Sequence, residues 1–236
     1  MRRSKSRSEE PPSAAGLLQP ADFKDLQLGG AVYKSVRQAI ATGRFKPGDR
    51  LREVTIANLL NVSRTPVRDA LKRLESEGLL TNAPARGLIV TELDRQNVLE
   101  LYALREILEG SAAALAANRA SESEIVALFE ILEEEANHLD DAPKLAEINR
   151  HFHSAIYAAS HNRYLIAAAS GLSRSLHLLP GTTLSAPGRA ASSHEEHMEI
   201  VSHIEQRNPA TAEQIARQHI REARRLRLRM LFTYGS

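Results

Sequence analysis

The fold of this chain is decided by the stretch Asn61-Val62-Ser63-Arg64-Thr65-Pro66-Val67-Arg68-Asp69-Ala70-Leu71, which opens a helix that runs to Glu77 and stops at Gly78. Ser63 is a favourable N-cap residue, and Pro66 lies in the first turn, where its missing N–H costs nothing. Apolar residues then recur on one side, while basic and hydroxyl-bearing residues stand at the start and on the outer side. This pattern is typical of a helix that enters the major groove of DNA. The alternative is a basic helix on a solvated surface.

The flanking sequence favours the first interpretation. The predicted elements are helices at 31–42 and 54–60, the helix after Ser63, and strands at 79–81 and 87–91. Asn61-Val62-Ser63 is a turn of the length found in helix-turn-helix motifs. The two strand-prone runs are separated by Asn82–Arg86, which indicates a hairpin with an arginine at its tip. Three helices and a basic hairpin make a winged helix-turn-helix.

These elements resemble the N-terminal DNA-binding domain of GntR-type bacterial transcription regulators. The resemblance covers residues 29–91 and rests on the runs FKPGDRL (45–51), VSRTPVRDAL (62–71) and LESEGL (74–79). It implies a homodimer that binds a palindromic operator in double-stranded DNA. The residues that it places on DNA are Ser63, Arg64, Thr65 and Arg68 in the helix, and Arg86 and Gly87 in the hairpin. Some relatives add an arginine where this chain has Val54, and Arg52 is the candidate to replace it.

Charge is divided unevenly along the 236 residues. Residues 1–93 hold 16 Lys+Arg and 10 Asp+Glu, net +6, whereas residues 94–236 hold 15 and 19, net −4. The basic part suits a polyanion such as DNA. The absence of cysteine excludes disulfides and suits a cytoplasmic protein. The sequence contains no run of 18 apolar residues, so we expect no membrane span. Residues 1–25, rich in Ser, Pro, Glu and Arg, predict a disordered arm, followed by domains at 26–93 and 94–236.

The second domain shows helical periodicity alone. It predicts a six-helix antiparallel bundle, so the fold class is mainly α. The expected helices cover 94–119, 121–139, 141–160, 164–179, 191–207 and 210–231. On the first of them, the residues expected on the buried side are Val98, Leu101, Leu104, Ile107 and Leu108. The loop Pro180–Ala190 contains one charged residue, Arg189, and gives no indication of function.

Histidines carry the chemistry of this bundle. Asn149 and His153 are spaced i,i+4 and project from one face of their helix. His197 and His219 each lie among apolar residues of their own helices. Three imidazoles and an amide that converge in a bundle could bind a divalent metal and leave coordination positions open. Each histidine taken singly is better explained as a hydrogen-bonded residue between helices, so spacing alone does not establish a metal site.

The run NRHFH (149–153) resembles the [DN]-x-x-F-H motif of the FCD ligand-binding domain, the usual partner of a FadR-type winged helix, and six helices fit its VanR-like branch. The runs EHMEI (196–200) and QHI (218–220) fall where that family has its other two histidines. The resemblance implies that Asn149, His153, His197 and His219 bind a divalent ion, usually zinc, sometimes nickel or another. A small carboxylic acid, the effector, completes the coordination.

Asn149 and Arg105 are the two residues of this resemblance that bear on how the metal and the effector would bind. The family more often has aspartate where this chain has Asn149. Because an amide is neutral, the ion would keep its full charge, and we expect weaker metal binding with stronger attraction for an anionic effector. Arg105 matches an arginine that lies near the effector carboxylate in relatives. Alternatively, it forms an exposed i,i+4 ion pair with Glu109, which would contribute little.

The sequence therefore predicts a cytoplasmic, homodimeric transcription regulator, a repressor that a small organic acid releases from DNA, and not an enzyme. Two alternatives stay open. Zinc held by three histidines could activate water for a hydrolase, although no carboxylate in these motifs is placed as a general base. The other alternative is a regulator whose bundle binds no metal and only dimerises.

Overall fold

The computed structural model of the chain describes residue 19 and residues 27–232. The predicted disordered arm at residues 1–25 therefore lies, apart from residue 19, outside the described residues. The described residues divide into two units, one of residues 19, 27–92 and His177–Pro180, and the other of Leu93–Leu176 and residues 181–232. Among the described residues, no helix combines the length and apolar character that crossing a bilayer requires.

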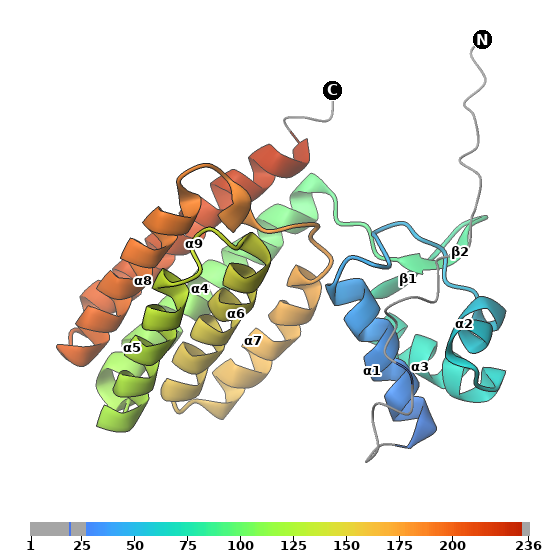
Figure 1. Cartoon of the computed structure of the whole chain (residues 1–236), viewed down its shortest axis with the longest axis horizontal. Coiled ribbons are helices and arrows are strands. Elements are labelled where there is room, and N and C mark those ends of the chain that lie inside the picture. The colour runs from blue at the N-terminus through green and yellow to red at the C-terminus, as the bar shows by residue number, and fades with distance from the viewer. Residues whose placement is uncertain (1–18, 20–26, 233–236) are drawn as a thin grey trace, which may run out of the picture. The chain divides into compact units, whose positions relative to one another are not determined.

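The first unit is a three-helix fold with a hairpin (Figure 1). Its elements are α1 (Leu28–Ala41), α2 (Glu53–Leu60), α3 (Arg64–Ser76), β1 (Leu80–Ala83) and β2 (Gly87–Val90). The strands pair antiparallel, with Leu80 opposite Val90 and Ala83 opposite Gly87. The pairing extends through Ala83, so the turn is shorter than the loop predicted at 82–86, and Ala85 takes a positive φ of 61° within it. The predicted winged helix-turn-helix is confirmed.

Local sequence and packing together fix α3. Ser63 occupies its N-cap position with extended backbone but makes no side-chain capping hydrogen bond. Asn61 takes a left-handed backbone conformation between α2 and α3, and Gly78, with φ 76°, follows the end of α3. The residues buried on its inner face are Val67, Ala70, Leu71 and Leu74. This apolar face holds α3 against the core, so its first turn stays exposed.

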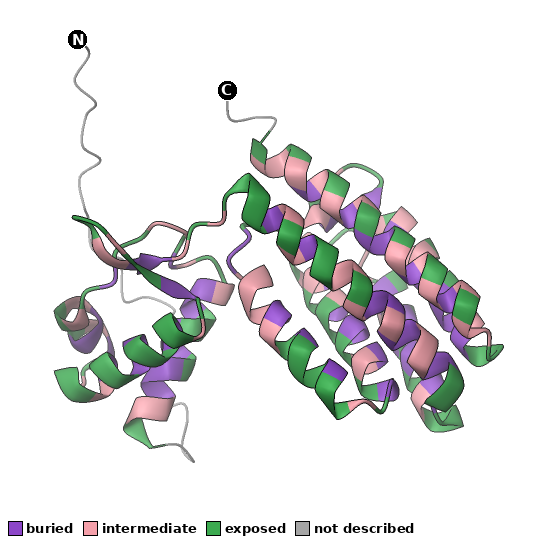
Figure 2. Cartoon of the chain, turned by 180° about the vertical axis from the view of Figure 1, so that it is seen from behind, coloured by how far each residue is buried: buried purple, intermediate pink, exposed green. Residues whose placement is uncertain are grey.

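The second unit is a bundle of six α-helices, as predicted (Figure 1). They are α4 (Arg95–Arg119), α5 (Glu122–Ala136), α6 (Ala142–Ala159), α7 (Arg163–Leu176), α8 (Arg189–Glu205) and α9 (Pro209–Phe232), with a 3-10 helix η2 (Thr183–Ser185) before α8. Capping boxes at Asp94 and Ser121 start α4 and α5. Figure 2 shows that the helices bury one side and expose the other.

Small residues let α4 and α9 approach closely. The alanines of α4 in the core are Ala112, Ala113, Ala116 and Ala117. At Gly110, an added Cβ would lie 2.6 Å from Arg217 Cγ on α9, so the backbone of α4 and the stem of that arginine are in direct contact. Short side chains along this face bring the two longest helices together.

The prediction of the buried side of α4 was partly wrong. Val98 is buried, but Leu104 and Ile107 are 48% and 51% exposed. The first half of α4 carries two apolar stripes. The stripe with Val98 and Tyr102 continues into the alanine face and is buried, whereas the stripe with Leu104 and Ile107 is exposed. Composition alone could not distinguish them, because the other stripe contains the larger apolar side chains.

Leu74→Ala should destabilise the first unit by about 2–5 kcal/mol, because Leu74 is fully buried and its truncation leaves a cavity under α3. Urea unfolding followed by circular dichroism measures the change. The exposed Lys72→Ala on the same helix is the control. Unfolding midpoints that agree for both variants and the wild type would contradict this packing.

Candidate metal centre and nucleic-acid interface

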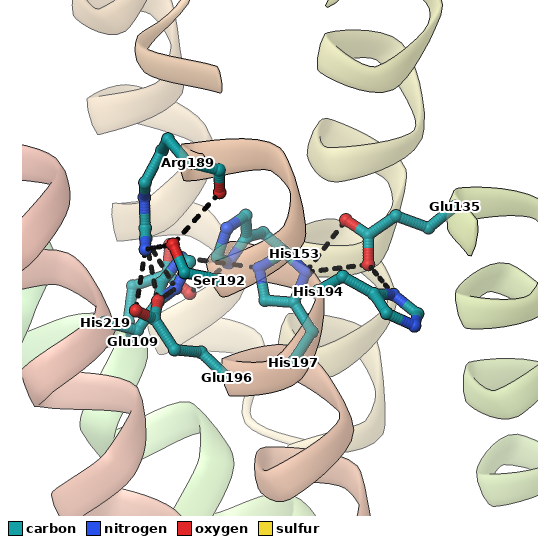
Figure 3. A network of polar contacts seen from close by, with 9 residues as sticks. All are labelled: Glu109, Glu135, His153, Arg189, Ser192, His194, Glu196, His197 and His219. Carbon is teal, nitrogen blue, oxygen red and sulfur yellow. Dashed lines mark hydrogen bonds and ion pairs between the residues drawn. The ribbon is translucent and has the colours of Figure 1, made fainter. Parts of the chain in front are cut away.

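Three buried histidines from three helices meet in the core of the second unit (Figure 3). His153 on α6, His197 on α8 and His219 on α9 are at most 5% exposed. One ring nitrogen from each lies within 4.8 Å of those of the other two. The structure therefore brings together three of the four residues that the sequence predicted as metal ligands.

A carboxylate binds the Nδ1 atom of each imidazole. The pairs are Glu109 with His153 at 2.9 Å, Glu135 with His197 at 2.9 Å, and Glu196 with His219 at 2.6 Å. Since an ionised carboxylate only accepts hydrogen bonds, each Nδ1 carries the proton and each Nε2 keeps its lone pair. Carboxylate partners of this kind orient metal-binding histidines and raise their basicity.

Burial favours the neutral form of His197 and His219, and the carboxylate of Glu196 stays charged. Burial lowers the pKa of His197, and lowers that of His219 well below its usual 6.5, although hydrogen bonds to Glu135 and Glu196 act in the opposite direction. Burial raises the pKa of Glu196, but hydrogen bonds from His219 and Arg189 outweigh it and bring the value down to about 2. Neutral imidazole is the form that binds a metal ion.

The geometry of the three Nε2 atoms fits a cation. His197 Nε2 and His219 Nε2 are 3.4 Å apart, and with Nδ1 protonated on both rings two lone pairs face each other. His153 Nε2 is buried and has no hydrogen-bond partner in the described part of the chain. Such a buried lone pair is costly unless something satisfies it. A set of imidazole nitrogens is the donor type that zinc and nickel accept.

Asn149 and Arg105 were the other two residues that the sequence predicted at this site. Asn149 is half-buried one turn before His153 on α6, and its role as a fourth ligand stays a prediction. Arg105 forms the i,i+4 pair with Glu109, with Nε 3.1 Å from Oε1, but the pair is buried rather than exposed. Arg105 therefore reaches His153 through Glu109.

Sequence reasoning missed Arg189 and Glu135 at this site, and Arg189 makes the larger set of contacts. Its Nη1 and Nη2 donate to the two oxygens of Glu196 at 2.6 and 2.7 Å, and Nη2 lies 3.3 Å from His219 Nδ1 (Figure 3). The side chain is 5% exposed. The predicted helix began at Ala191, whereas α8 begins at Arg189, after Gly188 with φ 73°. An earlier start would have placed Arg189 on the same helix face as His197.

The residues predicted to contact DNA lie on α3, on the hairpin and before α2. Those exposed at the surface are Arg52, Ser63, Arg64, Thr65, Arg68 and Arg86, and Gly87 is half-buried with φ 73°. Arg86 donates to the carbonyl oxygen of Gly48 at 2.8 Å, so its side chain joins the turn of the hairpin to the loop before α2. Contact with DNA by these residues stays a prediction.

Comparison with known proteins identifies both units. Residues 28–90 match the family described as bacterial regulatory proteins, gntR family, and residues 100–222 match the FCD domain. The chain is 31% identical over 185 residues to YdhC of Bacillus subtilis, an uncharacterized HTH-type transcriptional regulator, covering 77% of this chain and 83% of that protein.

Two further relatives support the same family assignment. A probable D-xylose utilization operon transcriptional repressor of Paenarthrobacter nicotinovorans is 32% identical over 184 residues, 77% of this chain and 80% of that protein. The solved structure of McbR/YncC of Escherichia coli shares the fold, with a TM-score of 0.74, 23% identity, and coverage of 87% of this chain and 99% of that one. This chain belongs to the GntR family of transcription regulators and carries an FCD domain. The family and these relatives are regulators and not enzymes, so the hydrolase alternative is set aside.

Glu135→Gln should weaken zinc binding by roughly 10–100-fold, because it removes the charge that holds the proton on His197 Nδ1. Calorimetric titration of the metal-free chain with zinc measures the change. Glu133→Gln on the exposed side of α5 is the matched control and should bind as the wild type does. Equal affinities for the two variants would show that Glu135 has no part in metal binding.

Proposed function

We propose that this regulator is a cytoplasmic homodimer that binds a palindromic operator, acts as a repressor and is released by a small carboxylic acid bound at a divalent metal ion. The observation that carries the proposal is the convergence of one ring nitrogen from each of three buried histidines, together with His153 Nε2, which has no partner in the described residues. The Paenarthrobacter relative is named as a probable repressor, which supports this sign of regulation.

In this proposal, His153, His197 and His219 hold the ion, with Asn149 as the fourth protein ligand and zinc or nickel as the metal. The bound ion supplies positive charge that attracts a carboxylate. The family resemblance assigned the effector contact to Arg105. Arg105 binds Glu109, and Glu109 in turn binds His153 Nδ1. Arg105 therefore has the role of positioning that histidine.

Arg189 is likewise engaged by a carboxylate, Glu196, but one of its guanidinium nitrogens stays unpaired among the described residues, so it is the better candidate for direct contact with the effector. Its guanidinium lies beside His219, and a planar fork suits a carboxylate. Its Nε is buried without a hydrogen-bond partner in the described residues, and so is the hydroxyl of Ser193. Ser193 lies one turn after Arg189 and one turn before His197, so all three project from one face of α8. Unsatisfied polar atoms on that face favour a polar, anionic ligand.

Release from DNA would follow from a population shift. The ligand favours one arrangement of the bundle, and in a dimer this arrangement sets the spacing of the two recognition helices. A coupling free energy of about 1–3 kcal/mol corresponds to a change of roughly 5–150-fold in operator affinity.

A test starts from a duplex that the wild-type chain selects from a random library. Its affinity, measured by fluorescence anisotropy at fixed salt, should fall roughly 5–150-fold with one class in a panel of small carboxylic acids. Chelation, His219→Ala and Arg189→Gln should each remove that response. A response that survives chelation would contradict the metal-dependent mechanism, and no response to any acid would favour a bundle that only dimerises.

The exposed apolar stripe of α4 supports the homodimer. Leu104 and Ile107 are one turn apart and about half exposed, and large exposed apolar side chains on one helix face mark interaction sites. A second copy of the chain is the partner that a palindromic operator requires.

Ile107→Glu should convert the dimer to a monomer, because it places a charge in the proposed apolar interface. Sedimentation velocity of the full chain measures the mass. Val126→Glu on α5, where the apolar side chain is 56% exposed, is the control and should stay dimeric. A dimeric Ile107→Glu variant would place the interface elsewhere.

A further inference from the structure

One carboxylate binds both arginines that are predicted to read DNA. Glu53 is the first residue of α2, and it lies across the turn from the start of α3. Arg64 Nη2 donates to its Oε2 at 3.1 Å. Arg68 donates from Nε to Oε1 at 2.9 Å and from Nη2 to Oε2 at 3.2 Å. The two helices of the helix-turn-helix are thus joined at their exposed side by a single acidic residue.

We propose that Glu53 is a specificity-determining residue, which aligns Arg64 and Arg68 for base edges and weakens their attraction to phosphate in general. The proposal rests on the DNA-contacting role proposed for these two arginines. It goes beyond that role by assigning a function to an acidic residue on a surface that should otherwise favour positive charge.

Alignment follows from the geometry of the contacts. An arginine side chain has many rotamers, and binding is favoured when the bound rotamer is already populated in the free protein. The two-point contact with Glu53 fixes both the direction and the plane of the Arg68 guanidinium. Each guanidinium carries five N–H groups, and Glu53 takes only one or two of them. Donors therefore remain on both arginines for the O6 and N7 atoms of guanine.

The negative charge of Glu53 weakens non-specific binding to DNA. Two guanidinium groups and one carboxylate sum to +1, and unspecific affinity for duplex DNA comes from phosphates neutralised by cations. Hydrogen bonds from Arg68, and then from Arg64, lower the pKa of Glu53, so the carboxylate is ionised at neutral pH. A carboxylate at this position repels phosphate on any DNA, which lowers the affinity for every duplex. At the operator alone, the aligned arginines also contact the correct base edges, which offsets this loss.

The contacts have little structural value. The side chains of Arg64, Arg68 and Glu53 are 60%, 50% and 28% exposed, and exposed ion pairs contribute little to folding. Variants of Glu53 should therefore fold normally, and an unchanged thermal unfolding midpoint is the check.

The experiment measures two affinities of the full chain over a range of salt concentrations. One duplex is the site that the wild-type chain selects from a random library, and the other is a scrambled duplex of the same length and composition. Glu53→Gln should bind the scrambled duplex more tightly without an equal gain for the selected site, so the ratio of the two affinities falls at least about fivefold. Glu53→Asp keeps the charge but is too short to reach both arginines, and its ratio should also fall.

Glu75→Gln is the matched control, because Glu75 is exposed on α3 and loses the same charge. It should raise both affinities by one factor and leave the ratio unchanged. If Glu53→Gln behaves as Glu75→Gln does, or if Glu53→Asp keeps the wild-type ratio, the proposed role of Glu53 is overturned. If the wild-type chain selects no site from the library, the proposal that fails is operator binding itself.

Discussion

Burial of three imidazole rings side by side requires that every ring nitrogen finds a partner, and this requirement organises the second unit. Each Nδ1 has a carboxylate, and each carboxylate has another partner: Arg105 for Glu109, Arg189 for Glu196 and His194 for Glu135. Buried charges are tolerated when they are paired and hydrogen-bonded in this way. The network leaves His153 Nε2 without a partner among the described residues and gives His197 Nε2 only the Nε2 of His219, and a divalent cation would satisfy all three together.

The same network links five of the six helices of the bundle. Glu109 lies on α4, Glu135 on α5, His153 on α6, His197 on α8 and His219 on α9. A ligand that changes the position of one ring therefore acts on several helices, because close-packed interiors shift between discrete arrangements rather than deform smoothly. In the first unit the polar contacts are exposed and the core is apolar. The two units thus differ in where their charged groups lie: the second has a buried polar centre, and the first has an exposed charged surface.

Much of this was readable from the sequence, because it depends on local signals. The turn between α2 and α3, the caps at Asp94 and Ser121, and the i,i+4 spacing of Asn149 and His153 each follow from residue type and helical period. The grouping of His153 with His197 and His219 came from the family resemblance. What the sequence could not give were long-range choices. Periodicity offered two apolar stripes on α4 and could not say which faces the core. Arg189 was missed because the helix was started two residues late, and Glu53 was missed because only folding brings it to Arg64 and Arg68.

The metal site proposed for this bundle is one ion bound by three imidazole nitrogens. X-ray absorption at the zinc edge tests it directly, on the chain loaded with one equivalent of zinc. The account predicts a first shell with three nitrogen scatterers at about 2.0–2.1 Å, and a loss of this imidazole signature in His197→Ala. A first shell that lacks imidazole nitrogens, or one that is unchanged in His197→Ala, would contradict it.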